Sequence, residues 1–158
     1  MLIRAATDSD ADLALVAELR LAFLADHRGI EPSAFDRAFA DATTAFVAER
    51  HCAGDLLTWF ADDDVPVGVV SMLLRPVPPR PDAFATTEGY VLNLYVVPDR
   101  RRQGIGQRLL DACLDHAAER SFRRLVLHAT EDGRAMYERA GFVRSDRWHE
   151  LDLSLIHI

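Results

Sequence analysis

The sequence predicts an α/β fold in which the strands of a sheet alternate with flanking helices, and three observations support this. In much of the first fifty residues, apolar side chains recur every three or four positions, which is typical of amphipathic helices. Between residues 55 and 97 they gather in compact runs separated by turn residues, which is typical of buried strands. A turn with two glycines at 104–106 then leads back to the helical spacing. We expect a single domain over residues 1–158, a length sufficient to bury a core.

The N-terminal third is expected to hold one short strand and two helices. Residues 2–5 form an apolar start that predicts the first strand. Residues 8–10 offer N-capping and acidic side chains, so a helix is expected to begin there and to end near Gly29. A second helix is expected to begin at 32–33, where a proline precedes a serine, and to continue to Phe46.

Three strands are expected in the middle of the chain. Residues 55–61 predict the first, and the three aspartates at 62–64 predict the turn that follows. Residues 65–75 are apolar on both faces and predict a central strand, and residues 88–97 predict its neighbour. Residues 76–87, with four prolines, are the longest irregular stretch, and they are either a functional loop or a plain connector.

The C-terminal part is expected to alternate helix and strand. An amphipathic helix is expected over 105–120, a strand over 125–129 and a short helix over 133–140. Alternating side chains at 148–155 predict a last strand. Residues 154–158 either complete that strand or form a non-native tail, and no functional weight is placed on them.

Composition excludes several classes of protein. The net charge of −7 disfavours nucleic acids and anionic membranes as partners. All 18 basic residues are arginines, which excludes Schiff-base chemistry and a Walker-type phosphate loop. Cys52 and Cys113 lack the spacing of a zinc or disulfide framework. There is no leader-like pattern and no apolar run near the roughly 20 residues of a membrane span. We therefore expect a cytoplasmic protein with no metal, no nucleic-acid partner and no membrane partner.

A basic segment with two glycines lies where the strand at 88–97 gives way to a helix. Glycines at the start of a helix let backbone N–H groups approach an anion, the helix dipole favours negative charge, and arginines add charged donors. Residues 100–106 (RRRQGIG) therefore predict a phosphate-binding loop. Alone, the segment is equally compatible with a basic turn that caps a helix. It lacks the third glycine of a dinucleotide fingerprint.

Together with a later motif, this loop resembles the GNAT superfamily of acyl-CoA-dependent N-acetyltransferases. Arg101, Gly104 and Gly106 match the pyrophosphate loop of that family, R-x-x-G-x-G. Residues 137–142 (YERAGF) resemble its late YExxGF element, and 127–134 resemble a subgroup written LHA[ST]xxGR. The resemblance covers essentially the whole chain.

The resemblance implies a GNAT fold. It consists of a mixed central sheet of about six to seven strands, flanked by about four helices. The fourth and fifth strands splay apart, and residues 90–97 resemble the bulged fourth strand. The implied cosubstrate is acetyl-CoA, which enters between the splayed strands. The implied reaction moves its acetyl group to a primary amine of a small molecule or peptide, by direct attack in a ternary complex.

Site residues follow from the resemblance position by position. Backbone groups of the fourth strand are expected to pair with pantetheine, and an N–H of Leu94 or Tyr95 is expected to polarise the thioester carbonyl. Thr130 stands where many members have Asn. The expected cosubstrate-binding residues are Leu94, Tyr95, Val96, Arg101, Arg102, Gln103, Gly104, Ile105, Gly106 and Thr130.

Two residues are expected to move protons. Tyr137 stands at the position of the usual general acid, and the alternative is a tyrosine packed under the cosubstrate. Glu88 begins the fourth strand and is the candidate base, and the alternatives are a solvated strand-end carboxylate or a water chain as base. A non-catalytic acyl-CoA-binding module or sensor on the same fold is the alternative function. A homodimer is a further expectation from the family.

The acceptor amine is expected to enter from the side built by the first two helices and their linker. The irregular stretch at 76–87 is a candidate for a second wall. The acidic net charge favours a cationic amine by long-range attraction.

Overall fold

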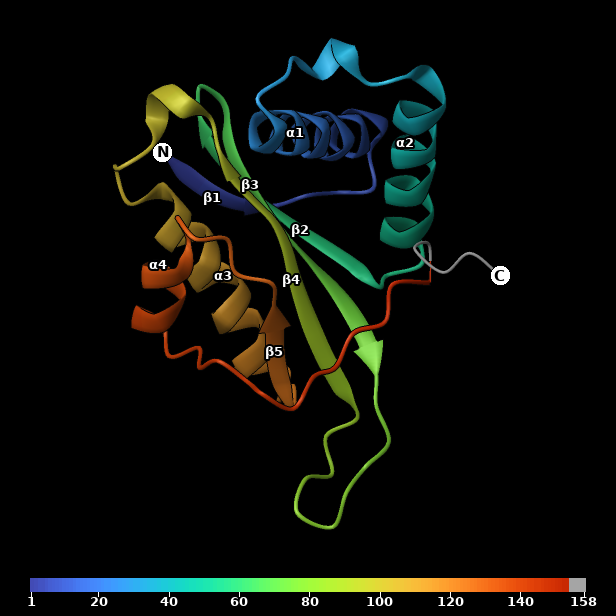
Figure 1. Ribbon diagram of the computed structural model, residues 1–158, viewed down its shortest axis with the longest axis vertical. Helices are drawn as coiled ribbons and strands as arrows, with labels where there is room; N and C mark the ends of the chain where they lie inside the picture. The colour runs from blue at the N-terminus through green and yellow to red at the C-terminus, as the bar shows by residue number, and fades with distance from the viewer. Residues whose placement is uncertain (154–158) are drawn as a thin grey trace. The chain divides into compact units, whose positions relative to one another are not determined.

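The computed structural model describes residues 1–153, which are drawn in colour in Figure 1. The chain divides into two compact units, Met1–His128 and Ala129–Ile158. The first unit holds the five-stranded sheet and three α-helices, and the described part of the second, residues 129–153, holds one short α-helix. A single domain over the whole chain stays a prediction.

Five strands form one mixed sheet in the order β1-β2-β3-β4-β5. The first three junctions are antiparallel, whereas β4 and β5 run parallel. The sheet is therefore mixed, as the sequence predicted. The strands are β1 Leu2–Ala5, β2 Leu56–Asp63, β3 Val65–Pro76, β4 Thr87–Val96 and β5 Arg124–Leu127.

Four α-helices are present within residues 1–153, in agreement with the predicted number of about four. They are α1 Asp10–Arg28, α2 Arg37–Cys52, α3 Ile105–Glu119 and, in the second unit, α4 Arg134–Arg139. The Ser9 side chain caps α1 by accepting the Asp12 N–H. The second helix begins later than predicted, because Pro32–Ala34 forms only a 3₁₀ turn and Asp36 caps α2 by accepting the Phe39 N–H.

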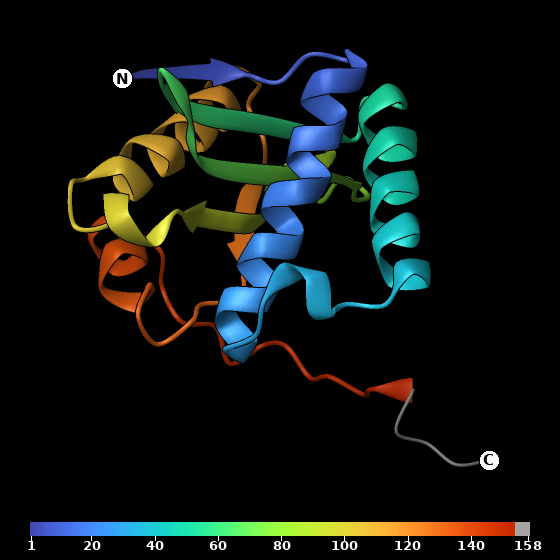
Figure 2. The ribbon, with the colours of Figure 1, turned by 90° about the horizontal axis from the view of Figure 1, so that it is seen from above.

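Helices cover both faces of the sheet in the first unit. In Figure 2, α1 crosses the strands and α2 runs alongside it. Side chains of α1 and α2 pack with Phe60, Val69 and Tyr95 in one apolar core. On the other face, Leu109 and Ile105 of α3 lie against Gly68, where a Cβ atom would meet Leu109 at 3.0 Å.

The number of strands differs from the prediction. Six to seven were expected, and five are present among residues 1–153. Residues 148–153 of the last predicted strand are not a strand, and the rest of it lies outside the described residues. Leu151 and Leu153 are each 72% exposed, so the alternating pattern there has no apolar surface to cover. A strand needs a neighbour as well as a pattern.

The irregular stretch predicted at 76–87 is a loop over residues 77–86 between β3 and β4. Arg80 and Ala83 exchange backbone hydrogen bonds near its tip. Of the helices within residues 1–153, none combines the length and the apolar character needed to cross a membrane. The expected cytoplasmic location and the homodimer stay predictions.

Candidate active site

Strand β4 is bulged and only partly paired on one side. Its parallel pairing with β5 extends over Glu88–Val91, yet β4 continues to Val96. The register with β3 shifts between Leu92 and Tyr95, and Asn93 in that interval has a φ of 55°. The predicted bulge is therefore present, whereas the splay between the two strands stays a prediction. Beyond the last pair, β4 backbone groups on the β5 side have no β5 neighbour, and an extended molecule has access to such an edge.

The predicted phosphate-binding loop links β4 to α3. Pro98–Arg100 forms a 3₁₀ turn, and Arg102 and Gly104 adopt positive φ values of 63° and 77°. Helix α3 begins at Ile105 without a side-chain cap. The first N–H groups of a helix have no acceptor within it, and the dipole makes this end positive. The loop and helix start therefore form a local anion-binding geometry.

The three arginines of the loop are not equivalent. Arg101 donates from Nε to the Val96 carbonyl at 2.9 Å and from Nη2 to Asp26 at 2.8 Å. Arg100 pairs with Asp63. Arg102 and Gln103 are exposed. Two of the arginines thus join the loop to other parts of the first unit, whereas Arg102 has no such contact among the residues that the structure describes.

The candidate base Glu88 is buried, with 3% of its surface exposed, so it is not a solvated strand-end residue. Both of its carboxylate oxygens accept hydrogen bonds from Arg124 of β5. This guanidinium lowers the pKa of Glu88, although burial acts in the opposite direction. Two residues along β4, the Tyr90 hydroxyl lies 2.8 Å from His128 Nδ1.

Thr130 and Tyr137 belong to the second unit. The Thr130 hydroxyl accepts the Gly133 N–H at 3.3 Å. Gly133 lies against the Tyr137 ring, because a Cβ atom there would be 2.8 Å from the ring. Burial raises the pKa of Tyr137, so its phenol is protonated at neutral pH and has a proton to donate.

Sequence reasoning missed one residue of the first unit. Arg20 occupies a position in the apolar stripe of α1, and its Nη1 donates to the Asn93 side-chain oxygen at the bulge. The signal in the sequence was a charged residue at a position where the helical spacing predicts an apolar one. The partner lies 73 residues away along the chain, so the contact follows only from the fold.

An open strand edge followed by a helix start without a side-chain cap is a geometry that suits an extended molecule with a phosphate group. Residues 16–142 match the acetyltransferase (GNAT) family, and the chain belongs to this family. The resemblance to this family stated from the sequence is therefore confirmed.

Similar proteins span different shares of the chain. A predicted acetyltransferase with acetyl-CoA from Clostridium acetobutylicum is 27% identical, with a TM-score of 0.84 and 99% of each chain covered. A GCN5-related N-acetyltransferase from Ralstonia eutropha JMP134 is 27% identical, with a TM-score of 0.77, 96% of this chain and 97% of that chain covered. N-alpha-acetyltransferase 30 of Schizosaccharomyces pombe is 36% identical over 72 residues, which is 44% of this chain. The chain spans about half, 48%, of that curated relative.

Proposed function

We propose that the protein transfers the acetyl group of acetyl-CoA to a primary amine of a small molecule or peptide, by direct attack in a ternary complex. The observation that carries this proposal is the position of the unpaired β4 edge immediately before the uncapped start of α3. An extended pantetheine arm suits the first feature and a diphosphate suits the second.

Backbone groups do most of the binding in this proposal. Leu94, Tyr95 and Val96 pair with the amides of pantetheine, and an N–H of Leu94 or Tyr95 stabilises the developing oxyanion. The N–H groups of the loop hold the diphosphate, with the exposed Arg102 adding charge. The loop residues in this role are Arg101, Arg102, Gln103, Gly104, Ile105 and Gly106, and Thr130 assists near pantetheine.

The chemical step needs two proton movements. The neutral amine attacks the thioester carbon, the C–S bond breaks, and the sulfur leaves with the electron pair as a thiolate. A base, Glu88 or a water chain, takes the proton that the amine loses. The pairing of Glu88 with Arg124 and its lowered pKa make it a weak proton acceptor, which favours water. Tyr137 gives a proton to the thiolate, since its raised pKa keeps the phenol protonated.

Tyrosine replacement tests this assignment. The measurement is thiol release from acetyl-CoA over a panel of primary amines, with direct CoA titration of the same proteins. We expect Tyr137→Phe to lower kcat by roughly 100-fold with little change in CoA affinity. The matched control is Tyr90→Phe, which also removes only a hydroxyl.

Each alternative gives a different result. Wild-type turnover in Tyr137→Phe makes this tyrosine a packing residue. No thiol release by the wild type with any amine, despite CoA binding, favours a non-catalytic acyl-CoA-binding module.

A further inference from the structure

Arg20 is a guanidinium that lacks a carboxylate partner on the α1 face of the sheet. Its Nη1 donates to the Asn93 oxygen, and within residues 1–153 it has no other hydrogen bond and no ion pair. A guanidinium carries five N–H donors in a fixed planar fork. Most of this fork is therefore available to another acceptor.

The surroundings of Arg20 oppose an unpaired charge. The side chain is half-buried in α1, and burial lowers its pKa. Removing a charge from water is costly unless an opposite charge or a full set of hydrogen bonds replaces the water. An anion that binds beside Arg20 would offset this cost, because it would supply the missing opposite charge.

The bulge itself does not require a cation. Asn adopts the left-handed region more readily than most residues, so the φ of 55° at Asn93 needs no charged partner. Because arginine only donates, Asn93 presents its oxygen to Arg20. That orientation leaves the Asn93 amide NH₂ group without an acceptor among residues 1–153. Two sets of donors therefore lie side by side.

These donors lie next to the proposed reaction centre. Asn93 directly precedes Leu94, and consecutive Cα atoms are about 3.8 Å apart. The bulge lies just past Val91, where pairing with β5 ends. An anion at Arg20 and an acetyl group at Leu94 are therefore separated by a distance of the order of one amino acid.

We propose that the acceptor carries a carboxylate close to its amine, as an amino acid does, and that Arg20 and the Asn93 amide bind this carboxylate. This inference rests on the proposed function and names its substrate class. One guanidinium with one neutral amide matches a monoanion better than the dianion of a phosphate monoester. Arg20 is then a specificity-determining residue for the acetyl transfer.

Matched acceptors test the proposal. Amino acids are compared with their carboxamides by kcat/KM for thiol release. The carboxamide has the less basic amine and more of it is unprotonated at neutral pH, so a preference for the acid cannot arise from amine reactivity. We expect the wild type to prefer the acid by at least about tenfold, since a charge-assisted bond contributes that much or more.

Two variants should remove this preference by different routes. Arg20→Gln is expected to lower kcat/KM for the acid by about 10- to 100-fold and to leave the carboxamide unchanged. Asn93→Asp supplies Arg20 with an internal carboxylate, keeps a side chain that tolerates positive φ, and is expected to have the same effect. Arg120→Gln, at an exposed position directly after α3 on the other face of the sheet, is the control and should change neither acceptor.

The outcomes separate this inference from the proposed function. Equal use of acid and carboxamide by the wild type, or equal losses for both in Arg20→Gln, overturns the inference while transferase activity stands. If the wild type prefers an amino-sugar phosphate over amino acids, the proposal that the acceptor carries a carboxylate is overturned. If no amine is acetylated, the carboxylate site is tested by binding instead. The affinity for an N-acetyl amino acid is compared with that for its carboxamide by titration. Binding that requires the carboxylate and is lost in Arg20→Gln supports the site. If the wild type shows no binding that depends on the carboxylate, the site is overturned.

Discussion

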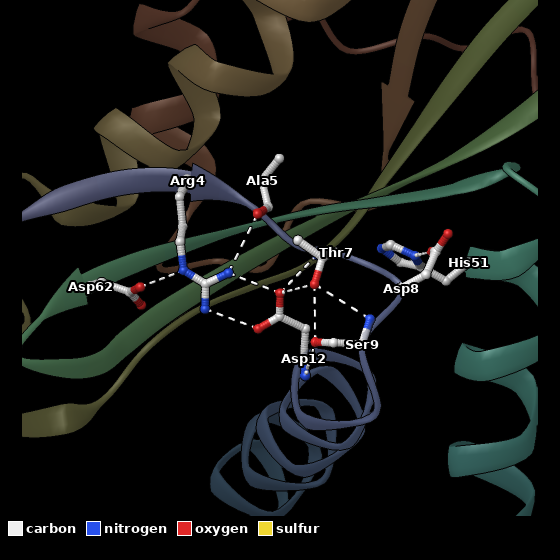
Figure 3. A network of polar contacts seen from close by, with 8 residues as sticks. All are labelled: Arg4, Ala5, Thr7, Asp8, Ser9, Asp12, His51 and Asp62. Carbon is white, nitrogen blue, oxygen red and sulfur yellow. Dashed lines mark hydrogen bonds and ion pairs between the residues drawn. The ribbon is translucent and has the colours of Figure 1, made fainter.

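Arg4 and Arg20 both lie on the side of the sheet where α1 packs, but their surroundings are opposite. Arg4 of β1 donates to Asp62 at 2.5 Å and to both oxygens of Asp12 at 2.9 and 3.0 Å. Figure 3 shows this fork enclosed by carboxylates, with Thr7 completing the shell of Asp12. Arg20 has a single neutral partner, Asn93.

The difference shows how one residue type serves two purposes. The hydrogen bonds that Arg4 donates to Asp12 and Asp62 raise its pKa, whereas burial lowers the pKa of Arg20. A guanidinium whose donors are used inside the protein ties structural elements together, here β1, β2 and the start of α1. A guanidinium with unused donors costs free energy in the empty protein and gains it from a ligand. Four measurements break or sharpen this contrast.

The largest expected effect is the loss of stability when Asp12 is replaced. Asp12→Ala leaves Arg4 with one carboxylate and removes the acceptor of the Thr7 N–H and hydroxyl. We expect the free energy of unfolding to fall by about 2–3 kcal/mol, a usual range for lost hydrogen bonds to charged groups. Denaturant unfolding measures it. The control is Asp10→Ala, which removes an exposed carboxylate from the first turn of α1. An equal loss of unfolding free energy in this variant contradicts the stabilising role of the Asp12 hydrogen bonds.

Lowering the pH should gradually remove the contribution of Asp12 to the free energy of unfolding. The Arg4 guanidinium holds the pKa of Asp12 below its usual range. A carboxyl with a lowered folded pKa contributes its full stability above the unfolded value of about 4, and loses it as pH falls from there toward the folded pKa. The difference in unfolding free energy between the wild type and Asp12→Ala should therefore narrow below about pH 4. A constant difference down to pH 2 excludes this linkage.

Arg101 is an intermediate case, since its donors are partly used and it lies beside the loop. Arg101→Ala should weaken CoA binding about tenfold, because it removes a charge and the link between the loop and Val96. Asp26→Asn keeps that link and should leave CoA affinity within about twofold, since the Arg101–Asp26 pair is 40% and 41% exposed. Titration calorimetry with CoA measures both. If both variants weaken CoA binding equally, the loss comes from the Arg101–Asp26 ion pair.

The smallest expected effect is on the stability of Arg20→Gln. Losing the hydrogen bond to Asn93 and relieving a half-buried charge act in opposite directions. We expect the free energy of unfolding to change by no more than about 0.5 kcal/mol. Denaturant unfolding of Arg20→Gln alongside Arg4→Gln gives the comparison. A loss as large as that of Arg4→Gln makes Arg20 a structural residue.

Local signals predicted the parts of the fold and site that are contiguous in the sequence. The N-cap of α1 at Ser9 and the glycine-containing loop each depend on a few neighbouring residues, and each is present. The bulge in β4 is also present, but it was implied by the family resemblance and not by a local signal. Contacts between distant segments were not predictable. The Glu88–Arg124 pair spans 36 residues and the Arg20–Asn93 contact spans 73. The last predicted strand failed for the same reason, because an alternating pattern does not specify a neighbouring strand.

The unequal pairing of β4 has a consequence for the order of folding. Strands β2, β3 and β4 follow one another through a turn at Asp64 and the loop at 77–86, so they close at low entropic cost. Joining β5 to β4 requires the whole of 97–123, including α3, to be ordered first. Backbone amides of β3 should therefore exchange their hydrogens most slowly, and those of β5 sooner. The strand edge at which we propose that acetyl-CoA binds coincides with the boundary between the early and the late parts of the sheet.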